Sequence, residues 1–128
     1  MRTLKFIVAP TLILGLVIGL AALRAADEAP KYTIKEVMKM AHTGETSLAK
    51  KVASGKASKA DDKKLVDLYT ALAANTPPQG DADVWKDKTG ALLDAAKSVE
   101  DGKDGAAKDL KKAMDCKACH EVFKPKKK

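Results

Sequence analysis

The chain is expected to fold as an all-α protein, an antiparallel four-helix bundle preceded by an apolar N-terminal helix. Three observations predict this. From Tyr32 onward apolar residues recur about every three to four positions, the spacing of helices that bury one face. Short polar, glycine or proline segments separate these stretches, and short connections favour antiparallel neighbours. No segment shows the alternation that is typical of a strand.

The first two helices of the bundle have clear start and stop signals in the sequence. Thr33-Ile34-Lys35-Glu36 has the form of a capping box, which begins a helix. This helix is expected to bend or restart near residues 43–46, where glycine and threonine weaken it, and to end at Gly55. Ser58 begins the second helix. Residues 75–80 end it, because their two prolines cannot continue a helix.

The third helix is expected to open at Asp81 or Asp83 and to bury Trp85. Residues 102–105 form a turn, and the fourth helix is expected to run without interruption over residues 106–123. Its inner side is expected to carry Leu110, Ala113, Met114, Cys116, Cys119, His120 and Phe123. These boundaries define one domain over residues 31–124.

Residues 1–26 have the pattern of an export signal. Arg2 and Lys5 precede an uncharged apolar run over residues 6–23, and alanines follow on both sides of Arg24. We expect cleavage after Ala25 or Ala26. The alternative is a retained membrane anchor through residues 6–23, which reach the minimum length of a spanning helix. Either way the domain is expected in the periplasm or on the outer face of the cytoplasmic membrane.

The charge pattern excludes several classes of function. The net charge is +7, but lysines and acidic residues are interspersed and only 4% of residues are aromatic. This argues against nucleic-acid binding, which favours clustered positive charge and stacking aromatics. No Ser/His/Asp group or glycine-rich phosphate loop indicates an enzyme. The basic tail, residues 125–128, is interpreted as a solvated end, with attraction of an acidic partner as the alternative.

Cys116-Lys117-Ala118-Cys119-His120 holds both cysteines of the chain and matches the C-x-x-C-H attachment signature of haem c. We expect the two thiols to form thioethers to the porphyrin and His120 to be the proximal ligand of the iron. A disulfide here would close too short a loop to stabilise the fold much. Zinc needs more ligands, and His42 is the only other histidine.

Because the pentad lies on the last helix, the chain resembles the class II c-type cytochromes, the cytochrome c′ superfamily. In residues 116–124 an aromatic and then a basic residue follow the histidine, as in that family. Residues 79–85 resemble its loop before the third helix. The first helix departs from the family pattern, with Thr33 and Ile34 where many members have an Arg-Gln pair.

The resemblance implies a single-electron carrier with one haem c and a redox partner protein. In low-spin members a methionine of the first helix is the distal iron ligand, which Met38 matches by its spacing to Gly55. His42, one turn later, is the alternative distal ligand. Lys124 and Trp85 are expected to contact the haem, Lys124 through a propionate.

The alternative function is that of a five-coordinate cytochrome c′ that binds nitric oxide or carbon monoxide. The resemblance also extends to a homodimer formed through an exposed apolar face of the first two helices. The two functions differ in whether Met38 fills the sixth coordination position of the iron. A ligand at this position closes the iron to gases, whereas an apolar side chain beside it leaves the iron open.

Overall fold

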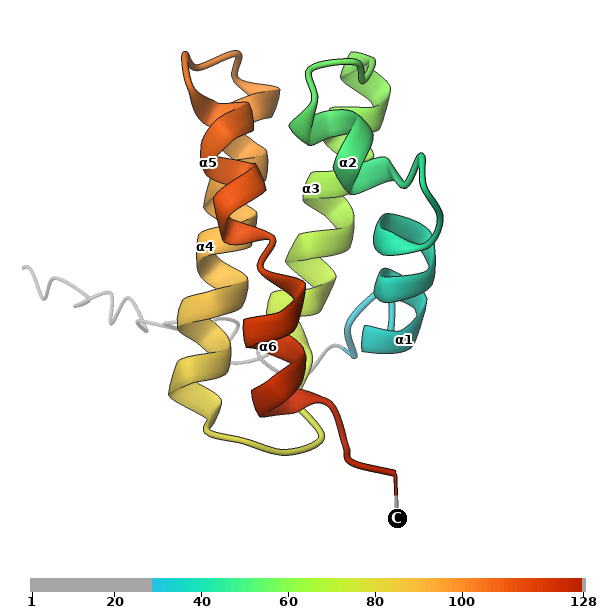
Figure 1. Ribbon diagram of the computed structural model, residues 1–128, viewed down its shortest axis with the longest axis vertical. Coiled ribbons are helices and arrows are strands. Elements are labelled where there is room, and N and C mark those ends of the chain that lie inside the picture. The colour runs from blue at the N-terminus through green and yellow to red at the C-terminus, as the bar shows by residue number, and fades with distance from the viewer. Residues whose placement is uncertain (1–28, 128) are drawn as a thin grey trace, which may run out of the picture.

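The computed structural model describes residues 29–127, and all regular structure within them is helical (Figure 1). The all-α prediction is therefore confirmed. The elements are α1 (Ile34–Val37), the π-helix η1 (Met38–His42), α2 (Leu48–Ala53), α3 (Lys59–Ala74), α4 (Ala82–Glu100), α5 (Ala106–Ala113) and α6 (Cys116–Phe123).

The expected signal or anchor, residues 1–26, lies outside the described residues. Between residues 29 and 127 no helix combines the length and the apolar character that crossing a membrane requires. The location of the protein therefore stays a prediction from the N-terminal sequence.

The two longest helices, α3 and α4, lie side by side along the long axis of the molecule and run in opposite directions (Figure 1). Helix α5 packs against α4, while α2 packs against both α3 and α5. The first helical segment, α1, packs against α3. The contact between α2 and α5 joins two helices that are far apart in the sequence.

The core is formed by apolar side chains from every helical segment. Helix α3 contributes four of the eight largest fully buried side chains, which are Leu65, Leu68, Tyr69 and Leu72. Trp85 of α4, Leu110 of α5 and Phe123 of α6 are also buried. For α3 and α5, the face that the apolar spacing predicted is the face that packs inward.

The predicted helix starts are confirmed. Thr33 and Ser58 each form a complete capping box, with Glu36 and Asp61 as the reciprocal partners. Asp81 caps α4, because its side chain accepts hydrogen bonds from the backbone N–H groups of Asp83 and Val84. Such caps satisfy backbone donors that have no partner inside the helix.

The predicted break in the first helix is also confirmed, since η1 ends at His42 and α2 begins only at Leu48. The π-turn over Met38–His42 was not expected. Its wider winding leaves the Met38 carbonyl to accept a hydrogen bond from Thr43 Oγ1 at 3.3 Å. Turns of this type are rare and are frequent at functional sites, and this one holds both candidate distal ligands.

The prediction of an uninterrupted fourth helix was wrong. Helix α5 stops at Ala113, and the backbone of Met114 and Asp115 leaves the helical conformation, with ψ angles of 42° and 87°. The Asp115 carboxylate then accepts a hydrogen bond from the Ala118 N–H at 3.0 Å and caps α6. An aspartate is a strong N-cap residue, so a new helix begins at the first cysteine.

Because of this interruption, the side of the chain that faces the core beyond Ala113 differs from the side that an uninterrupted helix would bury. Leu110 and Phe123 are buried as expected, whereas Cys116 and His120 are exposed. The apolar spacing of α5 therefore does not determine which side of α6 packs inward.

Gly80 is a position where an added methyl group should be costly. Its φ angle is +87°, and a Cβ would lie 2.8 Å from Phe123 Cδ1. We expect Gly80→Ala to destabilise the fold by at least about 2 kcal/mol in urea unfolding. Gly90→Ala is the control, because nothing lies near its Cβ position inside α4, and it should gain up to about 1 kcal/mol. Equal stabilities would contradict this packing.

Asp61 should titrate at unusually low pH. The Lys51 ammonium at 2.8 Å and the Ser58 cap lower the pKa of this carboxyl from 3.8 to about 2. Because the pKa is lower in the folded state, the stabilisation is present above pH 3.8 and is lost as the pH falls through about 2. NMR titration should show this midpoint. Lys51→Met should raise it and Lys50→Met should leave it unchanged.

Candidate functional site

A pocket of about 520 Å³ lies between η1 and α2 on one side and the α5–α6 junction on the other. It is lined by His42, Ser47, Ala49, Lys50, Ala53, Ser54, Lys111, Met114 and Cys116. This pocket joins the attachment pentad to the first helical segment, so we take it as the candidate site.

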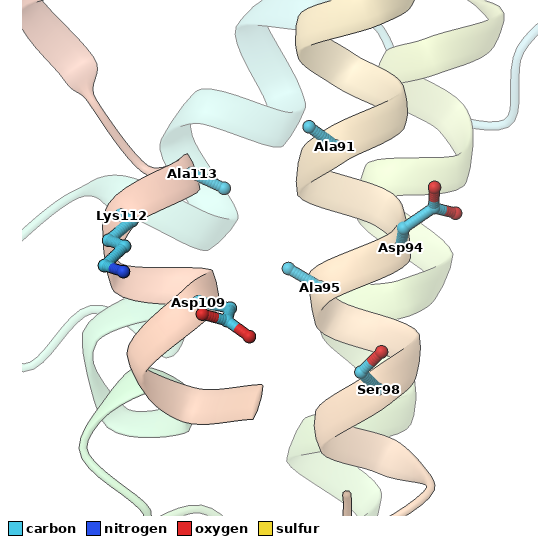
Figure 2. A pocket seen from close by; sticks show the side chains of 7 residues that line it. All are labelled: Ala91, Asp94, Ala95, Ser98, Asp109, Lys112 and Ala113. Carbon is cyan, nitrogen blue, oxygen red and sulfur yellow. The ribbon is translucent and has the colours of Figure 1, made fainter. Parts of the chain in front are cut away.

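A second hollow of about 510 Å³ lies between α4 and α5. In Figure 2, Ala91 and Ala95 of α4 point toward Ala113 of α5, while Lys112 points away from α4. The residues that line it include no cysteine, histidine or methionine. It offers no soft or imidazole ligand and contains none of the predicted site residues.

Helix α6 positions the three residues of the attachment motif within little more than one turn. Cys116 is exposed and Cys119 is half-buried, and neither forms a disulfide. Burial raises the pKa of the Cys119 thiol, an effect that the Lys88 ammonium partly opposes. His120 lies one helical turn beyond Cys116 and is exposed. Of the three motif residues, Cys116 lines the pocket, whereas Cys119 and His120 lie on the same helix outside its lining.

His42 lies in the pocket wall on the other side. Its Nε2 is 3.2 Å from the hydroxyl of buried Tyr69, and the two rings are stacked with centroids 5.7 Å apart. Burial lowers the pKa of His42, and the positive charge of His120 lowers it further. Burial raises the pKa of Tyr69, and nearby Cys116 adds to that rise.

Met38 has a different environment from His42. It is half-buried and packs against the core cluster, and it is not among the residues that line the pocket. The structure therefore brings His42, rather than Met38, to the pocket that holds Cys116. The π-turn contributes to this difference, since the rule that i and i+4 share a face applies to α-helical winding.

Trp85 and Lys124 also lie outside the pocket lining. The Trp85 N–H donates a hydrogen bond to the Asn75 carbonyl at 2.8 Å, and its ring meets Phe123 edge-on at 5.0 Å. Lys124 is exposed just after α6, where its carbonyl accepts a hydrogen bond from Gln79 at 3.0 Å. Trp85 thus ties the end of α6 to the start of α4.

Removing the Trp85 ring should weaken the packing of α6. Trp85→Ala is expected to cost about 3–5 kcal/mol in urea unfolding, because a large buried ring is lost. Trp85→Phe keeps most of the ring but loses the hydrogen bond to Asn75. Loss of this bond should lower the free energy of unfolding by about 1 kcal/mol, in addition to the effect of the changed packing. A Trp85→Ala variant with native stability would show that this contact does not hold α6.

The pocket residues that were not identified from the sequence include Ser47, Lys50 and Lys111. Ser47 precedes α2 at the N-cap position, yet its hydroxyl makes no capping bond. Its side chain is buried, and its Oγ has no hydrogen-bond partner among the described residues. No local pattern marks these residues, because only the packing of α2 against α5 brings them together.

The residues present fit a haem better than a bare metal ion. Within residues 29–127 no three histidine, cysteine or acidic side chains cluster as ligands for an ion, whereas zinc sites usually use about four ligands. In a haem most of the coordination comes from the porphyrin, so the protein supplies only the axial ligands. The pocket provides an imidazole, a thiol, apolar side chains and a buried hydroxyl without a partner among the described residues.

Comparisons with protein-family models, with curated proteins and with solved structures found no match for this chain. A functional assignment therefore depends on the attachment motif and on the side chains around the pocket. The resemblance to class II cytochromes has the same basis.

Proposed function

We propose that this chain is an exported c-type cytochrome of the cytochrome c′ kind, a single-electron carrier with one covalent haem. The observation that carries the proposal is the position of the C-x-x-C-H motif. Both cysteines and His120 lie on one short helix beside a pocket, and a second imidazole, His42, lies in the pocket wall. If the C-x-x-C-H sequence had arisen by chance, there would be no reason to expect a pocket beside it.

The helix contacts support the finer fold assignment, an antiparallel four-helix bundle with the haem on its last helix. Helices α3 and α4 form the long pair, and α2 and α5 complete the contacts around the centre. In this assignment α1, η1 and α2 together form the interrupted first helix, and α5 and α6 form the interrupted fourth helix. Bundles of this type hold cofactors between side chains of facing helices.

Each site residue has a proposed role. Cys116 and Cys119 form the thioethers, and His120 is the proximal ligand. The resemblance favours Met38 as the distal ligand, whereas the pocket lining favours His42. The haem supplies the one-electron chemistry, and the protein sets its potential through the axial ligands and through burial.

The charge distribution supports a redox partner with an acidic surface. Residues 106–127 contain seven lysines and three acidic residues, whereas residues 29–105 contain thirteen lysines and twelve acidic residues. The excess positive charge thus lies on the segment that includes the attachment motif. Such a field raises the rate of encounter with an oppositely charged surface.

The test is to express the full chain in a bacterial host with cytochrome c maturation machinery. A denaturing gel stained for haem should show a band, and the mass should exceed that of the processed polypeptide by one haem. Colourless protein with two free thiols would refute the proposal.

One observation favours the gas-binding alternative. Met38 packs against the core cluster and does not line the pocket, so the methionine that fills the sixth position in low-spin relatives lies away from the site, which favours an iron with an open sixth position. High-spin ferric and ferrous spectra, together with tight carbon monoxide binding, would select this function over electron transfer.

A further inference from the structure

The Ser47 hydroxyl points to a bound group in the pocket. The residue is only 5% exposed, and its Oγ is the one buried side-chain oxygen or nitrogen without a hydrogen-bond partner in the part of the chain that the structure describes. Native proteins rarely leave such a group unpaired unless a ligand, ion or water completes it. Because Ser47 lines the pocket, the missing partner belongs to whatever the pocket holds.

Two ammonium groups line the same pocket. Lys50 comes from α2 and Lys111 from α5, so they approach from its two walls. Neither forms a salt bridge within residues 29–127. No acidic side chain lines the pocket. Besides His42 and Ser54, the polar lining therefore combines two cations and an unpaired hydroxyl, which suits carboxylates.

We propose that Ser47, Lys50 and Lys111 form a clamp for the propionate carboxylates of the haem. This inference rests on the proposed function, because it takes the haem to be tethered through Cys116, which lines the same pocket. The porphyrin carries two carboxylates, and the clamp offers one ammonium for each. Lys124, the propionate partner expected from the sequence, does not line the pocket.

The clamp differs from a general basic surface in being specific to the pocket. Lys112 is the neighbour of Lys111 on α5, but it lines the hollow between α4 and α5, which holds none of the clamp residues (Figure 2). Replacing Lys111 or Lys112 changes the net charge equally. Only Lys111 should therefore affect the propionates strongly.

The test uses haem-loaded wild-type protein and the variants Lys50→Met/Lys111→Met, Ser47→Ala and Lys112→Met. Resonance Raman spectra report hydrogen bonding at the propionates, and the pH dependence of the reduction potential reports their proton affinity. We expect a shifted propionate bending band in the double variant and in Ser47→Ala. In the double variant the proton affinity should rise about tenfold or more, since nearby cations favour the charged carboxylate. Lys112→Met should match the wild type.

Two results would overturn the clamp while leaving the proposed function intact. In one, the double variant and Lys112→Met give the same spectra and proton affinities. In the other, Ser47→Ala leaves the propionate band unchanged, which would mean that water or a free anion satisfies the hydroxyl. A haem-stained gel separates these results from failure of the proposed function, since protein without covalent haem would remove the basis of both.

Discussion

A chain with serine in place of both Cys116 and Cys119 should leave a cytochrome-c-maturing host with no covalent haem. Serine preserves the size and polarity of each side chain but cannot form the thioether. The chain has no other cysteine, so no second thiol can take over. The expected result on a haem-stained denaturing gel is complete loss of the band, with the polypeptide itself still present.

Lys117→Ala is the matched control for this variant. Lys117 lies between the two cysteines, is exposed, and forms a salt bridge with Glu121 at 3.9 Å. An exposed pair of this kind contributes little, so attachment should be unchanged. Each single Cys→Ser variant should retain one thioether and give a weaker band. Covalent haem on the double variant would exclude the thioether assignment.

The fold was predictable where local chemistry decides it. The capping boxes at Thr33 and Ser58 and the cap at Asp81 each depend on residues within one turn. The break at Met114–Asp115 was missed, because the apolar spacing continues across it and conceals the capping role of Asp115. The π-turn over Met38–His42 was missed as well, since no residue pattern used in the prediction distinguishes it from α-helical winding.

The candidate site was predictable only in its covalent part. Cys116, Cys119 and His120 are adjacent in the sequence, so their spacing is sufficient to identify them. The pairing of His42 with Tyr69 depends on how η1 packs against α3. The meeting of Ser47 with Lys111 likewise depends on contact between α2 and α5. Contacts of this kind join elements distant in sequence, and helical periodicity does not specify their partners.

The choice between Met38 and His42 has a large spectroscopic consequence. The pocket favours His42, because His42 lines it whereas Met38 packs in the core. Tyr69 supports this assignment. A histidine that ligates a metal usually donates its other ring N–H to a fixed acceptor. The Tyr69 hydroxyl lies 3.2 Å from Nε2, which is within hydrogen-bond distance. With the proton on Nε2, the lone pair on Nδ1 is free for the iron.

We therefore expect His42→Ala to convert a low-spin haem into a high-spin one that binds carbon monoxide. Added imidazole should restore the low-spin spectrum, because it replaces the missing ring. Met38→Leu is the matched control, as it removes the thioether sulfur with little change in volume, and it should leave the spectrum unchanged. If Met38→Leu instead abolishes a methionine-to-iron charge-transfer band and His42→Ala keeps it, Met38 is the ligand. In that case the imidazole of His42 stays with Tyr69, and the resemblance rather than the pocket identifies the distal side.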